Sequence, residues 1–110
     1  MDYILSPSLL SADFTKLDRE IKICEENNVP YLHVDVMDGM FVPNISIGIP
    51  VVKSIRKITD LVLDVHLMIV KPERYIEAFA EAGSDIINIH YEATEDCVPV
   101  LKKIKNLGKK

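Results

Sequence analysis

The chain has 110 residues, of which 48% are apolar and 27% are charged, a balance typical of a globular protein with one domain over residues 1–110. Its formal charge of −4 and its aromatic content of 6% provide neither a basic stripe nor a stacking surface, so nucleic-acid binding is not expected. No apolar run approaches the roughly 20 residues that cross a bilayer, and the first residues lack a secretory pattern. We therefore expect a cytoplasmic protein without membrane contact.

Strand and helix patterns alternate along the chain. The expected strands, which are short and apolar, cover residues 3–10, 31–37, 61–69 and 85–91. The expected helices, which have apolar residues at helical spacing, cover residues 17–27, 51–58, 71–82 and 95–107. Gly83 stands where a glycine commonly ends a helix. Four βα units in alternation predict an α/β fold, with a parallel sheet whose strands are buried on both faces.

This order of elements matches the first half of a TIM (β/α)8 barrel. The polar residues of interest lie near the carboxyl ends of the expected strands, where open α/β sheets and (β/α)8 barrels both place their sites. A complete barrel needs roughly 200 residues or more, so we interpret the chain as a half-barrel of four βα units. An open sheet of the response-regulator type would need acidic residues at the end of the first strand, where the sequence has Ser6-Pro7-Ser8.

Three side chains from two strands suggest one metal site. His33 and Asp35 stand two residues apart, so strand alternation aims both at one point, and His66 occupies the matching place in the next strand. Neutral imidazole and carboxylate together suit zinc, iron(II), manganese or cobalt. A core histidine beside a strand-end aspartate is the alternative interpretation, but the third side chain favours a metal.

Other residues near these strand ends are candidates for substrate contact. Ser8 follows the first strand and is suited to orient a substrate hydroxyl, although a serine after proline often serves a turn. Met37 and Met68 each follow a candidate ligand by two residues, so they share its face and either line reacting carbons or belong to the core. His90 faces the expected mouth of the site or is structural. Asp64 either orients a ligand or lies on the solvent side.

Several motifs of the chain resemble the ribulose-phosphate 3-epimerase family. They are residues 6–14 (SPSLLSADF), 33–39 (HVDVMDG), 41–44 (FVPN) and 64–68 (DVHLM). The resemblance spans all 110 residues and implies a (β/α)8 barrel. It also implies metal-dependent epimerisation at C3 of D-ribulose 5-phosphate to D-xylulose 5-phosphate through a cis-enediolate, in the pentose phosphate pathway. Met40 and Ser46 depart mildly from the family pattern, which commonly has histidine and threonine there.

The resemblance also implies residue roles. His33, Asp35 and His66 would bind one divalent metal ion, and Asp35 would be one of two acid/base groups. The same motifs imply a set of substrate contacts, namely Ser8, Met37, His66 and Met68. The second catalytic aspartate, which is also the fourth ligand, and the glycine-rich phosphate site belong to the C-terminal half of the family's barrel. We therefore expect very low activity from the chain alone.

Two other functions remain open beside this one. The first is a 3-epimerase of the same family acting on a ketohexose phosphate such as D-allulose 6-phosphate. The second is a truncated assembly module without catalytic activity, which retains the motifs by descent. The expected partners are a small-molecule sugar phosphate and further copies of the chain, because a half-barrel would expose an apolar sheet face and unpaired strand edges.

Overall fold

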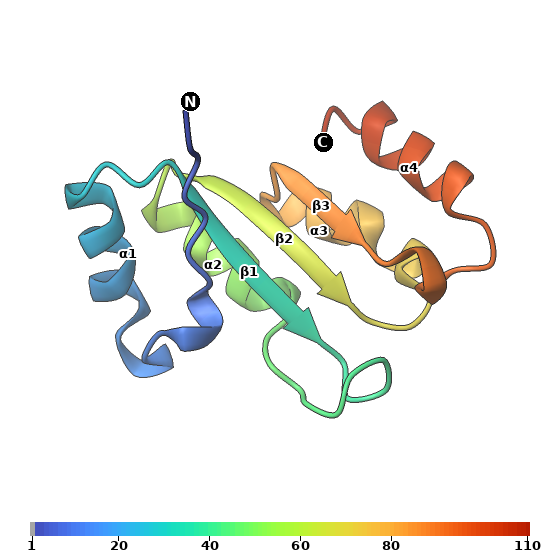
Figure 1. Cartoon of the computed structure of the whole chain (residues 1–110), viewed down its shortest axis with the longest axis horizontal. Coiled ribbons are helices and arrows are strands. Elements are labelled where there is room, and N and C mark those ends of the chain that lie inside the picture. Colours follow the sequence, from blue (N-terminus) through green and yellow to red (C-terminus); the bar gives the residue numbers. More distant parts are fainter. Residues whose placement is uncertain (1) are drawn as a thin grey trace.

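The computed structural model describes residues 2–110 as a three-stranded parallel sheet with helices on one side (Figure 1). The strands lie side by side in the order β1 (Tyr31–Met37), β2 (Val62–Met68) and β3 (Ile86–Ile89). The helices are α1 (Leu17–Glu26), α2 (Ile49–Ile58), α3 (Ile76–Ala82) and α4 (Cys97–Asn106). Short 3-10 turns occur at Leu9–Ser11, Phe14–Lys16, Pro72–Arg74 and Tyr91–Ala93. The predicted α/β fold with a parallel sheet is confirmed.

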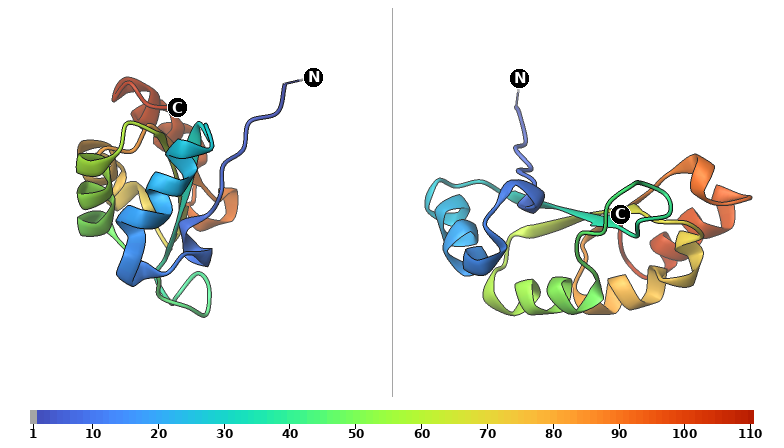
Figure 2. Two further views of the ribbon diagram at one scale, coloured as in Figure 1. Left: turned by 90° about the vertical axis from the view of Figure 1, so that its left-hand side faces the viewer. Right: turned by 90° about the horizontal axis from the view of Figure 1, so that it is seen from below.

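The core lies between the sheet and the helices. In β1 and β2 every second side chain is buried and alternates with a partly exposed one. The buried strand residues are Leu32, Val34, Val36, Leu63, Val65, Leu67 and Ile87. They pack against apolar side chains from each helix, including Ile21, Ile55, Phe79 and Ile104. Figure 2 shows all these helices on the same side of the sheet.

The expectation that the strands are buried on both faces is wrong. Within residues 2–110 no helix covers the second face, which we call the open face (Figure 2). Its strand residues alternate with the buried ones, and many are polar: His33, Asp35, Asp64, His66 and Asn88. The open face is therefore less apolar than predicted, and the homo-oligomer stays a prediction.

Residues 3–10 do not form the predicted first strand. Ser8 makes one isolated parallel bridge to His33, and the His33 amide donates to the carbonyl of Pro7 over 2.9 Å. The side chains of residues 3–5 are mostly exposed. Proline has no amide hydrogen to donate to β1, so a regular ladder does not form. The segment nevertheless runs beside β1.

The third predicted helix, over residues 71–82, is divided in the structure. Lys71 has a φ of 49°, in the left-handed region, so a helix does not begin there. A 3-10 turn follows, and α3 starts only after Tyr75. Gly83 ends α3 as predicted, with a φ of 121°, and a Cβ there would meet the Arg56 side chain at 2.4 Å. Glycine is required at this position for both reasons.

Both edges of the sheet have backbone partners. Beside β1 the partner is the segment that carries Ser8. Beside β3, the Ile87 amide donates to the Lys110 carbonyl over 2.8 Å, and the Lys110 amide donates to the Asp85 carbonyl over 3.1 Å. The edge of β3, the fourth expected strand, is therefore less free than predicted. Among the helices of residues 2–110, none combines the length and the apolar character needed to cross a membrane.

Candidate metal centre

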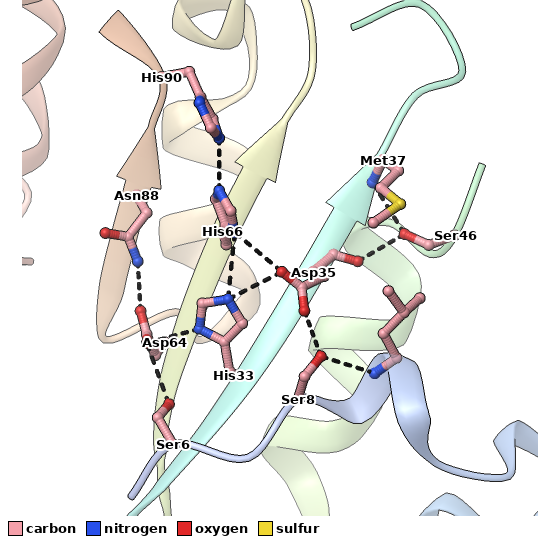
Figure 3. A network of polar contacts seen from close by, with 11 residues as sticks. Ser6, Ser8, His33, Asp35, Met37, Ser46, Asp64, His66, Asn88 and His90 are labelled. Atoms are coloured by element: carbon pink, nitrogen blue, oxygen red, sulfur yellow. Dashed lines mark hydrogen bonds and ion pairs between the residues drawn. The ribbon is translucent and has the colours of Figure 1, made fainter. Parts of the chain in front are cut away.

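Three side chains converge on the open face, His33 from the middle of β1 and Asp35 and His66 two residues before the ends of β1 and β2 (Figure 3). Strand pairing sets Asp35 directly opposite His66, and His33 lies on the same face two residues before Asp35. Nε2 of His33 and Nδ1 of His66 each lie 3.0 Å from Oδ1 of Asp35, and the two nitrogens are 3.3 Å apart. Together these side chains form a group with the spacing to hold a metal ion. The structure thus brings together the three residues that the sequence predicted as ligands.

The spacing and chemistry of these atoms suit a small divalent ion. Ligand atoms around a tetrahedral ion with bonds of about 2.0–2.1 Å lie about 3.3 Å apart. The side chains of His33, Asp35 and His66 are 24%, 12% and 26% exposed, so the site is shielded but accessible. Two imidazoles and one carboxylate form a donor set for zinc, iron(II), manganese or cobalt. The residues present therefore fit a divalent metal.

Asp64 of β2 orients His33. Its Oδ2 lies 2.9 Å from Nδ1 of His33 and accepts a hydrogen bond from the Ser6 hydroxyl over 3.2 Å. Its Oδ1 accepts from the side-chain amide of Asn88 over 2.5 Å. A carboxylate opposite Nδ1 keeps the proton on that nitrogen, so this hydrogen-bond pattern assigns a lone pair to Nε2. That lone pair faces the carboxylate of Asp35, an arrangement that a cation between them stabilises.

Asp35 is held in its ionised form. Its Oδ2 accepts a hydrogen bond from the Ser8 hydroxyl, and its backbone carbonyl accepts one from the Ser46 hydroxyl over 2.7 Å. Burial works to raise the pKa of Asp35, but the Ser8 hydrogen bond and the imidazoles of His33 and His66 outweigh it, so this pKa lies below its usual value. Asp35 is thus a carboxylate at neutral pH, as both a metal ligand and a general base must be.

The candidate substrate contacts lie around this group. Met37 and Met68 face each other across β1 and β2, one step along the open face from Asp35 and His66. The shared face that their spacing predicted is therefore found. Ser8 donates to Asp35, and its Oγ accepts from the Leu10 amide over 3.1 Å, so it also caps a turn. Contact of these residues with a substrate stays a prediction.

Some members of this network were not predicted from the sequence. Two interpretations stayed open for Asp64, and Ser6 and Asn88 were not expected to contribute. One signal was available, because Asp64 stands two residues before His66 and alternation alone puts it on the face of the site. Its pairing with His33 was not visible, because only the register of β1 against β2 sets these residues opposite each other.

Comparison with known proteins gives one consistent family. A model of the ribulose-phosphate 3 epimerase family matches residues 4–110. The chain is 53% identical over 109 residues to the ribulose-phosphate 3-epimerase of Synechocystis sp., a match that covers 97% of this chain and 47% of that protein. The Bacillus subtilis enzyme of the same name is 52% identical over 106 residues, covering 96% and 49%. The chloroplastic ribulose-5-phosphate-3-epimerase of Arabidopsis thaliana is 50% identical over 111 residues, covering 99% and 40%. The chain therefore spans about half the length of the curated relatives it matches.

Proposed function

The chain belongs to the ribulose-phosphate 3-epimerase family, and from this premise we propose that it supplies the metal-binding half of a site that interconverts D-ribulose 5-phosphate and D-xylulose 5-phosphate. One observation carries the proposal, namely the convergence of His33, Asp35 and His66 on the open face. The names of the relatives support the choice of substrate. Because the chain spans about half of their length, we assign the rest of the site to a second half-barrel.

Inversion at C3 requires a proton to leave one face of the carbon and another to arrive on the opposite face. Asp35 is the group for one face. Its carboxylate accepts the C3 proton while the electron pair of the broken C–H bond moves toward the C2 carbonyl, giving the enediolate of the sugar. A second acid/base group, outside residues 2–110, returns a proton to the other face and completes the inversion. Ser8 keeps the Asp35 carboxylate oriented during this transfer.

His33, Asp35 and His66 would hold one divalent ion, either zinc, iron(II), manganese or cobalt. When bound, the ion supplies Lewis-acid stabilisation of the negative charge that develops on the sugar oxygens. The two oxygens of Asp35 have different partners. Oδ1 faces the imidazoles that would share the ion, while Oδ2 contacts Ser8. Met37 and Met68 pack against the apolar side of the sugar and keep water from the enediolate.

A chimera tests this assignment. The chain replaces the matching half of the Bacillus subtilis relative, and turnover of D-ribulose 5-phosphate is measured with added zinc, manganese or iron(II). We expect the chimera to turn over the substrate and Asp35→Asn to lose at least about a hundredfold, since general acid/base catalysis contributes roughly 10²–10⁴. Asp60→Asn is the matched control, because Asp60 is an exposed carboxylate in the loop before β2. The unfused chain should turn over very slowly.

Two results would contradict the proposal. Undiminished turnover by the Asp35→Asn chimera would remove Asp35 from the chemistry. A rate for the unfused chain equal to that of the full-length relative would mean that this half needs no second half. The same assay with D-allulose 6-phosphate distinguishes a pentose from a hexose substrate.

A further inference from the structure

His66 makes a second contact on the side of its ring away from Asp35. Its Nε2 lies 2.7 Å from Nε2 of His90, the residue that directly follows β3 (Figure 3). The two rings are nearly parallel, with centroids 4.9 Å apart. The other nitrogen of His90, Nδ1, lies 3.3 Å from Oε1 of Glu92. A line of contacts therefore runs from Glu92 through His90 to His66.

The partners along this line determine which nitrogens carry protons. Two imidazole nitrogens 2.7 Å apart share one hydrogen bond, in which one donates and the other accepts. The Glu92 carboxylate accepts and so keeps a proton on Nδ1 of His90, which leaves a lone pair on Nε2 of neutral His90. When an ion is bound at Nδ1 of His66, the ring proton lies on Nε2, and His66 donates from there to His90. That Nδ1 is the atom that faces Asp35.

We propose that His90 is a positioning residue for the metal centre, because it accepts the Nε2–H of His66 and so leaves Nδ1 of His66 free to bind the ion. This inference rests on the metal site of the proposed function. On this proposal, each of the two ligand histidines is oriented by a side chain that comes from the neighbouring strand or directly follows it. His33 on β1 is oriented by Asp64 on β2, and His66 on β2 is oriented by His90 after β3.

The geometry makes His90 a supporting residue rather than a further ligand. Two nitrogens bound to one ion would lie about 3.3 Å apart, whereas His90 and His66 are closer, at a hydrogen-bond distance of 2.7 Å. The His90 ring also packs against Phe41, with centroids 5.0 Å apart, and its side chain is only 32% exposed. The ring is therefore held in place from a second side.

Two substitutions of His90 distinguish the effect of its hydrogen bond on zinc binding from the effect of its ring packing. His90→Gln supplies an amide oxygen that can accept from His66 but removes the ring. His90→Phe retains a ring against Phe41 but removes the acceptor. Zinc affinity of the 110-residue chain is measured by competition with a chromophoric chelator, and thermal unfolding checks that each variant folds. We expect His90→Phe to weaken zinc binding about 10–100-fold and His90→Gln to stay within about threefold of wild type.

Equal affinity of wild type and a folded His90→Phe variant would overturn the proposal. A loss in His90→Gln as large as in His90→Phe would overturn it too, because ring packing would then explain both. If the folded wild type binds no zinc, the proposed metal site fails, and imidazole ¹⁵N spectra of the zinc-free wild type decide the inference separately. Protonation of His90 at Nδ1, with Nε2 as the acceptor, would support the proposal, and protonation of His90 at Nε2 would overturn it. The spectra also decide the matter if His90→Phe does not fold.

Discussion

The two faces of the sheet are built from alternate residues of the same strands, yet they differ in almost every property. The helix-covered face consists of aliphatic side chains such as Leu32, Val65 and Leu67, each of which is fully buried. The open face carries imidazoles and carboxylates that hydrogen-bond to one another. A strand alternates its side chains between faces, so one strand can stabilise the fold on one side and hold reactive groups on the other.

The covered face stabilises the fold, whereas the open face carries the groups that are suited to chemistry. Burying an aliphatic side chain contributes about 1.5–3 kcal/mol, so the covered face holds the sheet and helices together. On the open face each polar group finds its partner within the network. Asp64, for example, accepts from three side chains at once. This network orients its members and contributes less to the free energy of folding.

Neighbouring residues of β2 provide the largest expected contrast. Leu67 is fully buried on the covered face, whereas Met68 is partly exposed on the open face. Leu67→Ala should lower the free energy of unfolding by about 2–5 kcal/mol, because it leaves a cavity among packed side chains. Met68→Ala should lower it by about 1 kcal/mol or less, because little area is lost. Urea denaturation measures both. Equal losses would mean that the open face is covered in solution, for instance by a second copy of the chain.

Zinc should stabilise the open face without altering the covered one. At free zinc of about 100 times the dissociation constant, binding to the folded chain alone raises the free energy of unfolding by about 2.7 kcal/mol. His33→Ala should abolish this gain, because it removes one of three ligand side chains, and EDTA should reverse it in the wild type. Denaturation with and without zinc measures the effect. An undiminished gain in His33→Ala would place the ion elsewhere.

Asp64→Asn should have an intermediate effect, confined to the site. The variant keeps the shape of the side chain but weakens the acceptor that holds the proton on Nδ1 of His33. We expect about tenfold weaker zinc binding, equivalent to about 1.4 kcal/mol, with little change in unfolding without zinc. Chelator competition measures the affinity, and Asp60→Asn is the control. Wild-type affinity in Asp64→Asn would show that His33 is oriented by other contacts.

Asp38 connects the loops that follow β1 and β2 and should give the smallest effect. Burial works to raise the pKa of Asp38, but hydrogen bonds from the amides of Val70, Phe41 and Met40 outweigh it, so its pKa is lowered. A carboxyl with a lowered folded pKa adds stability above its unfolded pKa, and this stability is lost as pH falls through the folded pKa.

Asp38→Asn removes this titration. The variant should therefore lose less stability than wild type between neutral and acidic pH, although it is less stable at neutral pH. Urea midpoints measured over that pH range test the difference. Identical slopes for the two proteins would mean that the amide hydrogen bonds to Asp38 do not persist in solution.

Much of the candidate site could be predicted from strand alternation. The spacing of His33 and Asp35 puts both on one face, and His66 stands at the equivalent place in the next strand. The prediction of a strand over residues 3–10, in contrast, was wrong. Its apolar residues suit a strand, but a regular ladder needs amide donors along the segment, and Pro7 has none.

The sequence by itself determined the alternation of strands and helices, the faces on which the reactive side chains lie, and the family. These features depend on local periodicity and on motifs within single strands. Only the tertiary structure decided which face is covered and which partner orients each histidine. Asp64 meets His33, and His90 meets His66, across neighbouring strands, and that depends on strand register and on where the chain leaves β3. Register is a property of packed strands, so no single segment contains it.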